Sequence, residues 1–526
     1  MSKEIPAAGF PEQAGISSLE IKALIDDFKD SGIEVHSMKI LRHGKSAFEA
    51  YAHPYRADMP HVMYSVSKSF VSVAMGFMFS EGRLTPQTKV IDLFPDFKPA
   101  NTDEKLEQMT VFHLLTMTAG KSVSIVSDKK RDTWVRDFFK ARWGYTPGEG
   151  WEYISENTYI CGVIIKRLTG LGLIDYLTPR LFEPLGITRR PVWESDPAGQ
   201  EAGGWGLFIT TDELARFMLC LQQKGVYDNN QVIPADYVAW ATSALVMNNR
   251  SNKNNHAGYG AYFWRNAMPG TYRADGMFSQ FGIVFEDYDA CFVCTCSEID
   301  EAKTLDCIFR HFPAMFVETS EEQPENSALD LKIEPLPVLE AMPRSVMEEF
   351  ISGKRITFAK NPVLNVAGFP TSMLPIPVVY MSSDKGGNIE NVVFDFKKDE
   401  CTMAWDEGRR HNVITCGMDG KERYSKIHLG GLDYTAVSTA AWADSSTLKI
   451  NMRPLESISE RCMTFEFKGK TVTCYPRCCP PLKSMTQNLK ETAPDYIPNE
   501  TVAKVGGTVI GDLDVIIEMP LHGRIK

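Results

Sequence analysis

A serine and a lysine three positions apart are the first residues whose types and spacing could support catalysis. They are Ser65 and Lys68, in the segment MYSVSKSF that begins a strongly apolar run. On a helix this spacing places both side chains on one face, one turn apart. A serine hydroxyl needs an adjacent base, and a lysine can be that base only if its pKa falls well below about 10.4. Burial and the positive end of the helix dipole both lower that pKa, so we expect Lys68 in a buried first turn.

The same pattern also fits an ordinary helix start, in which Ser65 caps the helix and Lys68 lies on the surface. Ser67 and Ser69 are competing nucleophiles, but Ser67 is adjacent to the lysine, so their side chains would point apart, and Ser69 follows the lysine. In the catalytic interpretation, the N–H of Ser65 has no partner within the helix and can bind an oxyanion. The spacing alone leaves both interpretations open.

Three later segments are EGRLTPQTKVIDLFPDF, MTVFHLLTMTAG and GGWGLFITTDELARF. Together with S-x-x-K, they resemble the penicillin-recognising serine hydrolases. That family includes class C β-lactamases, D-alanyl-D-alanine carboxypeptidases, related esterases and 6-aminohexanoate-dimer hydrolase. The resemblance covers residues 15–315 and implies that Ser65 is the nucleophile of an acyl-enzyme, with Lys68 as its base.

The segment PGEGWEYISENT resembles the family stretch that carries a third catalytic group, which implies that Tyr153 relays a proton to the leaving group. A phenol has a pKa near 10, so a neighbouring ammonium must help if it acts as a base. Ser155 stands where many members have asparagine, a pattern closer to the 6-aminohexanoate-dimer hydrolase and esterase branch. We expect it to hydrogen-bond substrate or Lys68. Asn157 is expected to cap the next helix, with substrate contact as the alternative.

The family's third element is a strand whose cation binds a substrate carboxylate, and the matching segment here is YRADGMFSQ. Ala274 stands at the cation's position, which argues against efficient β-lactam hydrolysis and against a carboxypeptidase. Arg273 could replace the cation, although adjacent strand residues point to opposite faces. Gly276 would let substrate approach the strand, and the resemblance makes the N–H of Met277 the second oxyanion donor. Gln280 either contacts substrate or pins the turn.

Four other residues near these motifs have weaker claims to function. His61 is expected to be structural, because this chemistry needs no histidine, and His113 is expected to be a core residue of its helix. Trp205 and Tyr262 are candidates to line the acyl pocket.

The elements that must position these residues follow from the hydrophobic pattern. It predicts two strands within 34–52, an apolar helix over 65–81 ended by Gly82, strands within 257–297 and a closing helix over 301–317. The region between is mostly helical. Strands from both ends would complete one antiparallel sheet, with the helical region inserted between them.

We therefore expect an α+β fold, with a β-lactamase/transpeptidase-like hydrolase domain over residues 1–317. Residues 318–345 are rich in Glu and Pro and are typical of a linker. Residues 346–526 alternate apolar and polar positions, which predicts a C-terminal all-β accessory domain. It resembles modules appended to some D-aminopeptidases. Its role stays open among stabilising the hydrolase domain, shaping its cleft and forming a dimer contact.

Length and composition bound the remaining possibilities. A chain of 526 residues is expected to form two or three units. Its net charge of -11 gives no support for binding nucleic acid or an anionic membrane. The N-terminal segment has no secretory pattern and no apolar run reaches the ~20 residues of a membrane span, so we expect a cytoplasmic protein.

The twelve cysteines are scattered and are expected to be free thiols. Cys474, Cys478 and Cys479 come closest to a metal cluster, but they lack a paired C-x-x-C, so no metal and no cofactor is expected.

The sequence thus predicts a cofactor-free serine hydrolase that cleaves an ester or amide of a small molecule. One alternative keeps the chemistry but acts on D-amino-acid amides, peptides or, weakly, β-lactams. An alternative of another class is a non-hydrolytic acyl-binding sensor. Transfer of the acyl group to an amine or alcohol, and homo-oligomerisation, also stay open.

Overall fold

The structure is a computed structural model that describes residues 4–98, 103–121, 134–196, 198–248, 252–323, 329–360, 388–408, 410–429, 431–481 and 518–526. The chain divides into two compact units, Met1–Glu334 and Pro335–Lys526, with a boundary inside the expected linker segment. Parts of that segment (324–328) and of the expected accessory domain (361–387 and 482–517) lie outside the described residues. No helix in the described ranges has the length and apolar character needed to cross a membrane.

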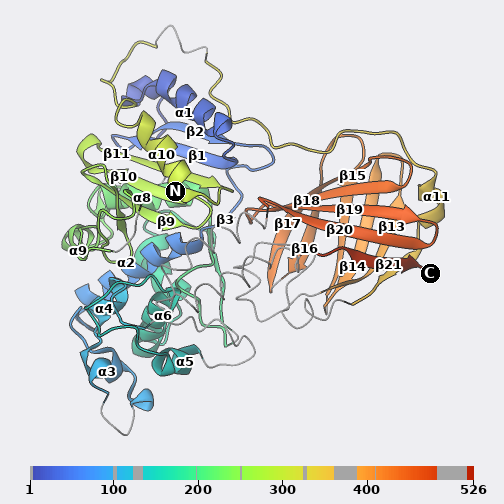
Figure 1. The fold of residues 1–526 in the computed structure, drawn as a ribbon. Helices are drawn as coiled ribbons and strands as arrows, with labels where there is room; N and C mark the ends of the chain where they lie inside the picture. The colour runs from blue at the N-terminus through green and yellow to red at the C-terminus, as the bar shows by residue number, and fades with distance from the viewer. Residues whose placement is uncertain are drawn as a thin grey trace. The chain divides into compact units, whose positions relative to one another are not determined.

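One six-stranded antiparallel sheet organises the N-terminal unit (Figure 1), with the strand order β2-β1-β11-β10-β9-β8. The strands are β1 (Val35–Arg42), β2 (Lys45–Tyr51), β8 (Trp264–Arg265), β9 (Thr271–Gly276), β10 (Gln280–Phe285) and β11 (Ala290–Cys296). Because β1 pairs with β11, the first and last strands of the unit lie side by side in the sheet. This arrangement confirms the predicted sheet built from both ends.

A helical region lies between β2 and β8, as the pattern predicts. Its helices are α2 (Ser67–Ser80), α3 (Glu104–Gln108), α4 (Val111–Leu115), α5 (Trp134–Lys140), α6 (Ser155–Thr169), α7 (Leu173–Leu177), α8 (Thr211–Gln222) and α9 (Ala235–Ala241). Short pairings join β3 (His61–Val62), β5 (Leu207–Ile209) and β4 (Val192–Trp193), and also β6 (Val226–Tyr227) and β7 (Asn230–Gln231). Gly82 follows α2 with a left-handed φ of 66°, as its predicted role in ending the helix requires.

The segment GYGAYFWRN contributes less strand than its alternation suggests. Only Trp264–Arg265 pairs in the sheet, as β8. Tyr262, just before it, has a φ of 63°. An extended strand cannot contain that conformation, so the chain turns within the segment.

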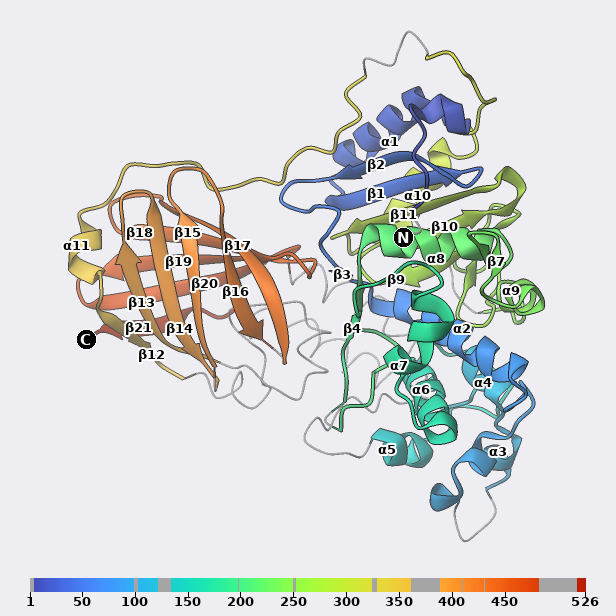
Figure 2. The same ribbon diagram turned by 180° about the vertical axis from the view of Figure 1, so that it is seen from behind.

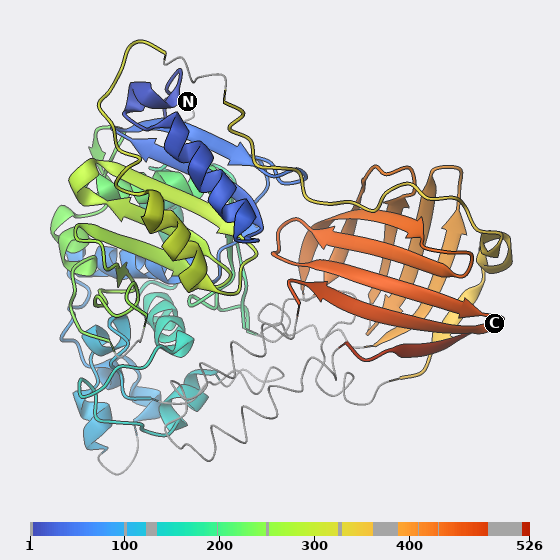
Figure 3. The same cartoon turned by 45° about the horizontal axis from the view of Figure 1, so that its top comes forward.

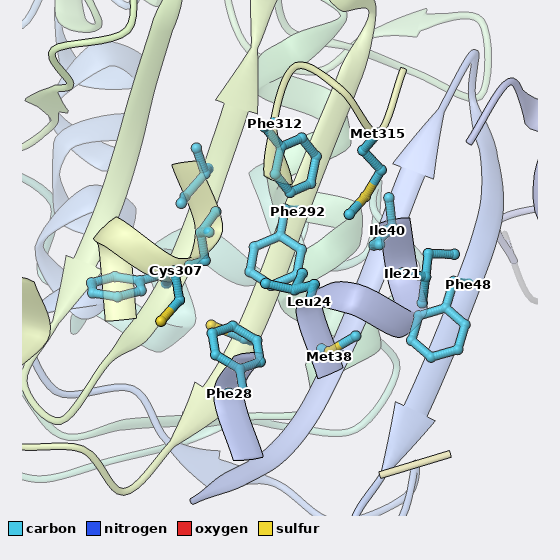
Figure 4. Close-up of a cluster of buried hydrophobic side chains, with 14 of the residues drawn as sticks. Ile21, Leu24, Phe28, Met38, Ile40, Phe48, Phe292, Cys307, Phe312 and Met315 are labelled. Atoms are coloured by element: carbon cyan, nitrogen blue, oxygen red, sulfur yellow. The ribbon is translucent and has the colours of Figure 1, made fainter. Parts of the chain in front are cut away.

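Both faces of the sheet are covered. On one face, α1 (Ser18–Asp30) and α10 (Glu301–His311) enclose the apolar cluster of Figure 4, in which Leu24 and Phe28 of α1 lie beside Phe292 of β11. On the other face, α8 packs on β1, β10 and β11 (Figure 2). The rings of Phe217 of α8 and Phe70 of α2 stack at 4.0 Å. The helix of the S-x-x-K motif, α2, therefore packs on α8 and also contacts β9 of the sheet directly.

The C-terminal unit is a ten-stranded sheet with the order β15-β14-β13-β12-β21-β20-β19-β18-β17-β16. Its strands are β12 (Arg355–Phe358), β13 (Ile389–Phe396), β14 (Glu400–Glu407), β15 (Arg410–Gly417), β16 (Arg423–Leu429), β17 (Leu432–Trp442), β18 (Thr447–Pro454), β19 (Glu460–Lys468), β20 (Thr471–Cys479) and β21 (Leu521–Ile525). A bridge between Gly417 and Thr439 joins β15 to β17, so the sheet closes on itself (Figure 3). Apart from α11 (Met347–Ile351), the described part of this unit is built from strands, as predicted.

Truncation of Phe292 tests the core under α1. We expect Phe292→Ala to lower the free energy of unfolding of the N-terminal unit by about 3–5 kcal/mol, because it leaves a cavity in a fully buried cluster. Urea denaturation gives the loss, and hydrogen exchange in β11 assigns it to this unit. Leu19→Ala, on α1 above this core but with a 55% exposed side chain, should change stability by less than about 0.5 kcal/mol. Equal losses in both variants would contradict this account of the core.

Candidate active site

The structure brings Ser65 and Lys68 together at the start of α2. Ser65 lies in a single 3-10 turn, Tyr64–Val66, that leads directly into the α-helix. The Lys68 Nζ donates a hydrogen bond of 2.8 Å to the Ser65 Oγ. Lys68 is 1% exposed, so the surface-lysine interpretation is wrong.

The competing serines, Ser67 and Ser69, form hydrogen bonds with other parts of the chain. The Ser67 Oγ accepts a hydrogen bond from the Leu207 N–H, and the Ser69 Oγ donates to the Tyr262 carbonyl. Both side chains are buried. Of the three serines, Ser65 is the one that the lysine contacts.

The Lys68 amine is enclosed by oxygen acceptors from three parts of the chain. Besides Ser65, it donates to the Ser155 Oγ at 3.1 Å and to the Gly204 carbonyl at 2.6 Å. Burial lowers its pKa from 10.5 to about 7, against the raising effect of the Glu156 and Asp275 carboxylates. A large share of the amines is therefore neutral near pH 7. Ser155 makes the expected contact with this lysine.

The backbone before the serine adopts an unusual conformation. Tyr64 has a φ of 44°, and Phe278 and Ser279 in the turn between β9 and β10 have φ values of 64° and 65°. Non-glycine residues with positive φ carry strain and persist only where the surroundings fix them. Here the rings of Tyr64 and Phe278 pack at 5.1 Å, which joins the two strained segments.

Gly276 explains how close these segments come. A Cβ on this residue would lie 2.4 Å from the Met63 carbonyl oxygen and 3.2 Å from a Val66 methyl. From the sequence, the lack of a side chain at Gly276 was expected to let substrate approach the strand. In the structure, it makes room for the protein's own backbone next to Ser65.

The β9–β10 turn is held from behind by Gln280. Its amide nitrogen lies within hydrogen-bonding distance of the carbonyls of Met277, Phe278 and Cys296, at 3.3, 2.8 and 2.8 Å. The side chain is fully buried, whereas Met277 at the tip is 41% exposed. Of the two roles considered for Gln280, these contacts favour pinning the turn.

The strand position of the family's cation is filled by a small apolar residue, Ala274, which is fully buried. Arg273 does not replace it. Its three guanidinium nitrogens donate to Asp275, to the Asn254 carbonyl and to the side chains of Asn255 and Asn266. The arginine is 1% exposed, and its guanidinium group forms these hydrogen bonds with other residues of the protein.

The Tyr153 ring also contacts the amine: its centre lies 4.8 Å from the Lys68 Nζ. It belongs to an aromatic cluster of four rings: Trp151, Tyr153, Tyr259 and Trp264. Ring centres within this cluster lie 4.9 to 6.3 Å apart. Trp151, Tyr259 and Trp264 were not expected at the site, although the aromatic density of WEY and YGAYFW was a signal for them.

Asn157 does not cap α6, contrary to expectation. The helix begins at Ser155, with Ile154 at the N-cap position, so Asn157 lies inside the first turn. Its buried amide points to the Met117 Sδ at 3.6 Å. The earlier helix start is the one that places Ser155 beside the lysine.

The remaining candidates are packed within the unit. The His61 Nε2 lies 3.0 Å from the His36 Nδ1, and burial lowers the pKa of His61 to about 3, in agreement with a structural role. His113 is only partly buried and closes a capping box with Thr110.

Trp205 and Tyr262 are both covered by other side chains. Trp205 packs on Trp134 at 5.9 Å, and the Tyr262 hydroxyl lies 3.5 Å from the Cys161 Sγ. Neither side chain is more than 4% exposed. Their packing does not support the expected place in the lining of an acyl pocket.

Comparisons with known proteins find an esterase and a hydrolase among the proteins similar to this chain. Over 152 residues the chain is 26% identical to Esterase EstB of Burkholderia gladioli. The aligned region covers 26% of this chain and 38% of the esterase. It is 24% identical over 230 residues to the 6-aminohexanoate-dimer hydrolase of Paenarthrobacter ureafaciens, covering 40% of this chain and 57% of the hydrolase. The chain thus matches less than two thirds of the length of either relative.

Among solved structures, a penicillin-binding protein homologue from Caulobacter crescentus superposes with a TM-score of 0.46 and 15% identity. The superposition covers 57% of this chain and 99% of the homologue. A family model described as Beta-lactamase matches residues 21–301, which are more than half of the chain and contain Ser65, Lys68, Tyr153 and the β9–β10 turn. The protein therefore belongs to the Beta-lactamase family.

Proposed function

We propose that this protein is a serine hydrolase that cleaves an ester or amide of a small molecule through an acyl-enzyme on Ser65. The observation that carries the proposal is the 2.8 Å hydrogen bond between the Ser65 Oγ and the buried Lys68 amine. A serine without such a base is a weak nucleophile. Burial supplies what the lysine needs, because it lowers the pKa of the amine to about 7.

Each group has one role in the proposed acylation. The neutral Lys68 amine accepts the Ser65 proton as the Oγ attacks the substrate carbonyl carbon. The N–H groups of Ser65 and Met277 bind the oxyanion. Tyr153 donates its proton to the leaving alcohol or amine, which departs as the tetrahedral intermediate collapses, and the Lys68 ammonium returns the serine proton to Tyr153. Water then attacks the acyl-enzyme, and the same groups return the proton to the Ser65 Oγ.

The surroundings of the serine favour a substrate without a carboxylate at the recognition strand. Ala274 provides no charge there, and Arg273 is paired inside the protein. A fixed cation is the usual partner of a carboxylate. Neutral esters and amides are therefore the favoured substrate classes, ahead of β-lactams and peptides with a free C terminus. The names of the two relatives, an esterase and a hydrolase of an aminohexanoate dimer, support the same order.

Replacement of the nucleophile is the direct test. We expect Ser65→Ala to abolish fluorophosphonate labelling and to lower hydrolysis of p-nitrophenyl esters by about 10³-fold or more. Ser67→Ala and Ser69→Ala are the matched controls, because both serines lie in the same turn without contacting Lys68. They should keep labelling, and peptide mass spectrometry should place the label on Ser65. Continued labelling of Ser65→Ala would contradict the proposal that Ser65 is the nucleophile.

A substrate panel separates the hydrolase from its alternatives. We expect turnover of p-nitrophenyl esters and neutral dipeptide amides to exceed that of nitrocefin, because the strand lacks the carboxylate-binding cation. Nitrocefin or D-alanyl amides turned over as fast as the esters would favour the D-amino-acid or β-lactam alternative. A burst of product without turnover would favour the acyl-binding sensor.

The labelling rate should depend on pH through the lysine. Because only the neutral amine accepts the serine proton, the second-order rate of Ser65 labelling should rise about tenfold per pH unit below pH 7 and level off above it. We call this rise of the labelling rate below pH 7 the lysine limb of the pH profile. Lys68→Met, of similar length but without the base, should remove both the activity and this limb. A wild-type rate that stays constant between pH 5 and 9 would contradict the role of Lys68.

The close approach at Gly276 gives a geometric test. Gly276→Ala places a Cβ 2.4 Å from the Met63 carbonyl, so the turn must shift relative to Ser65. We expect labelling to slow by about 10-fold or more, since small misplacements of reacting groups are costly. Gly282→Ala on neighbouring β10 is the comparison, because the three atoms nearest its Cβ belong to the buried Met218 side chain, at 2.6, 2.7 and 3.3 Å, so it crowds the core without pressing on the Met63 backbone. Equal rates in the two variants would show that the approach at Gly276 is not needed.

A further inference from the structure

A buried ion pair on β9 lies beside the proposed reacting groups but has no part in the proposed steps. The Arg273 Nε donates to the Asp275 Oδ2 at 2.6 Å, and the two side chains are 1% and 10% exposed. Residues two apart on a strand project from the same face, so the pair lies along one side of β9. An ion pair removed from water is costly unless its other hydrogen bonds are also satisfied. Here the remaining guanidinium nitrogens are hydrogen-bonded, so the pair can be held in one arrangement within the protein.

The arginine connects the pair to the aromatic cluster. Its remaining nitrogens tie β9 to the Asn254 carbonyl and to the side chains of Asn255 and Asn266. Its guanidinium carbon lies 5.5 Å from the Trp264 ring centre, and that ring lies 5.5 Å from the ring of Tyr153. A continuous set of contacts therefore runs from Arg273 to the proposed proton relay.

The aspartate connects the pair to the lysine. Asp275 directly precedes Gly276, which packs on the Met63 carbonyl two residues before the nucleophile. Its carboxylate acts on the charge of Lys68 from β9, as Glu156 does from α6, and both favour the ammonium form. Burial, together with the charge of the Glu156 carboxylate, raises the pKa of the Glu152 carboxyl to about 7. Within the described part of the chain, the amine also contacts the Tyr153 ring, the Ser65 and Ser155 hydroxyls and the Gly204 carbonyl.

We propose that the Arg273–Asp275 ion pair is a positioning element of the reaction: it fixes β9 next to Gly276 and holds Trp264 against Tyr153. The inference rests on the proposed function, because it assigns these residues to the Ser65 chemistry. Arg273 and Asp275 touch neither the nucleophile nor its base by a hydrogen bond. They act through Trp264 and through the position of β9.

Loss of the plateau rate is the distinguishing result. In Arg273→Gln and in Asp275→Asn the ion pair is broken, so the plateau rate of Ser65 labelling should fall by about 10-fold, and the Trp264 contribution to near-UV circular dichroism should change. In Asp275→Asn, a charge that favours the Lys68 ammonium is also gone, so the lysine limb should move down. A pair that only stabilises the fold would leave the plateau rate of the folded protein unchanged.

The conservative variant separates charge from geometry. Arg273→Lys keeps the positive charge but loses the planar fork that ties Asn254, Asn255 and Asn266 together. We expect its limb to stay near the wild-type pH, while the plateau rate falls by about 10-fold because Tyr153 is held less firmly. The Trp264 contribution to near-UV circular dichroism should change in this variant and reports the same loss of order.

A buried arginine far from the chemistry controls for destabilisation. Arg216 of α8 pairs with Asp212 at 2.7 Å and donates to two carbonyls. Arg216→Gln should lower stability without moving the limb or lowering the plateau rate. If Arg273→Gln fails to fold, Asp275→Asn decides the question alone. An unchanged plateau rate and an unchanged Trp264 circular dichroism signal in Asp275→Asn, with Ser65 still labelled, would overturn the inference and leave the proposed function intact. Labelling of Ser65→Ala would instead overturn the proposed function.

Discussion

The removal of the Lys68 ammonium from water is the constraint on which the proposed site depends. A lysine in solvent is protonated near neutral pH and cannot accept a proton from a serine. In this protein the amine is enclosed by the Ser65 and Ser155 hydroxyls and the Gly204 carbonyl. These acceptors satisfy a charged amine, while burial favours the neutral one, and the balance lies near pH 7. Two nearby carboxylates, from Glu156 and Asp275, keep that balance from falling further.

The rest of the N-terminal unit serves this enclosure. The sheet carries α8 on one face, and α8 holds α2 by the stacked rings of Phe217 and Phe70. From the edge of the sheet, the β9–β10 turn approaches the serine closely enough that only glycine fits at position 276. Gln280 fixes that turn from the core side. The backbone segments at Tyr64 and at Phe278, both with positive φ, thereby pack against each other through their rings.

Much of the fold and part of the site follow from local patterns. Strand alternation predicted β1 and β2, apolar periodicity predicted α2, and Gly82 marked its end, because each depends on neighbours along the chain. The failures share one cause, which is dependence on contacts distant in sequence. Asn157 lies within α6 because the helix starts where Ser155 can meet Lys68. The strand over 258–266 is cut short by the backbone at Tyr262, whose carbonyl accepts from Ser69.

The sequence by itself determined the chemistry on offer: a serine and a lysine one helical turn apart, a tyrosine in a family-like segment, and an alanine where a cation would stand. These are matters of residue type and spacing, which the chain carries before it folds. Only the tertiary structure decided how the groups are used. It buried the lysine, which lowered its pKa, committed Arg273 to Asp275 and three asparagines, and turned Gly276 towards Met63. Desolvation and close approach arise from residues far apart in the chain, so local sequence patterns do not record them.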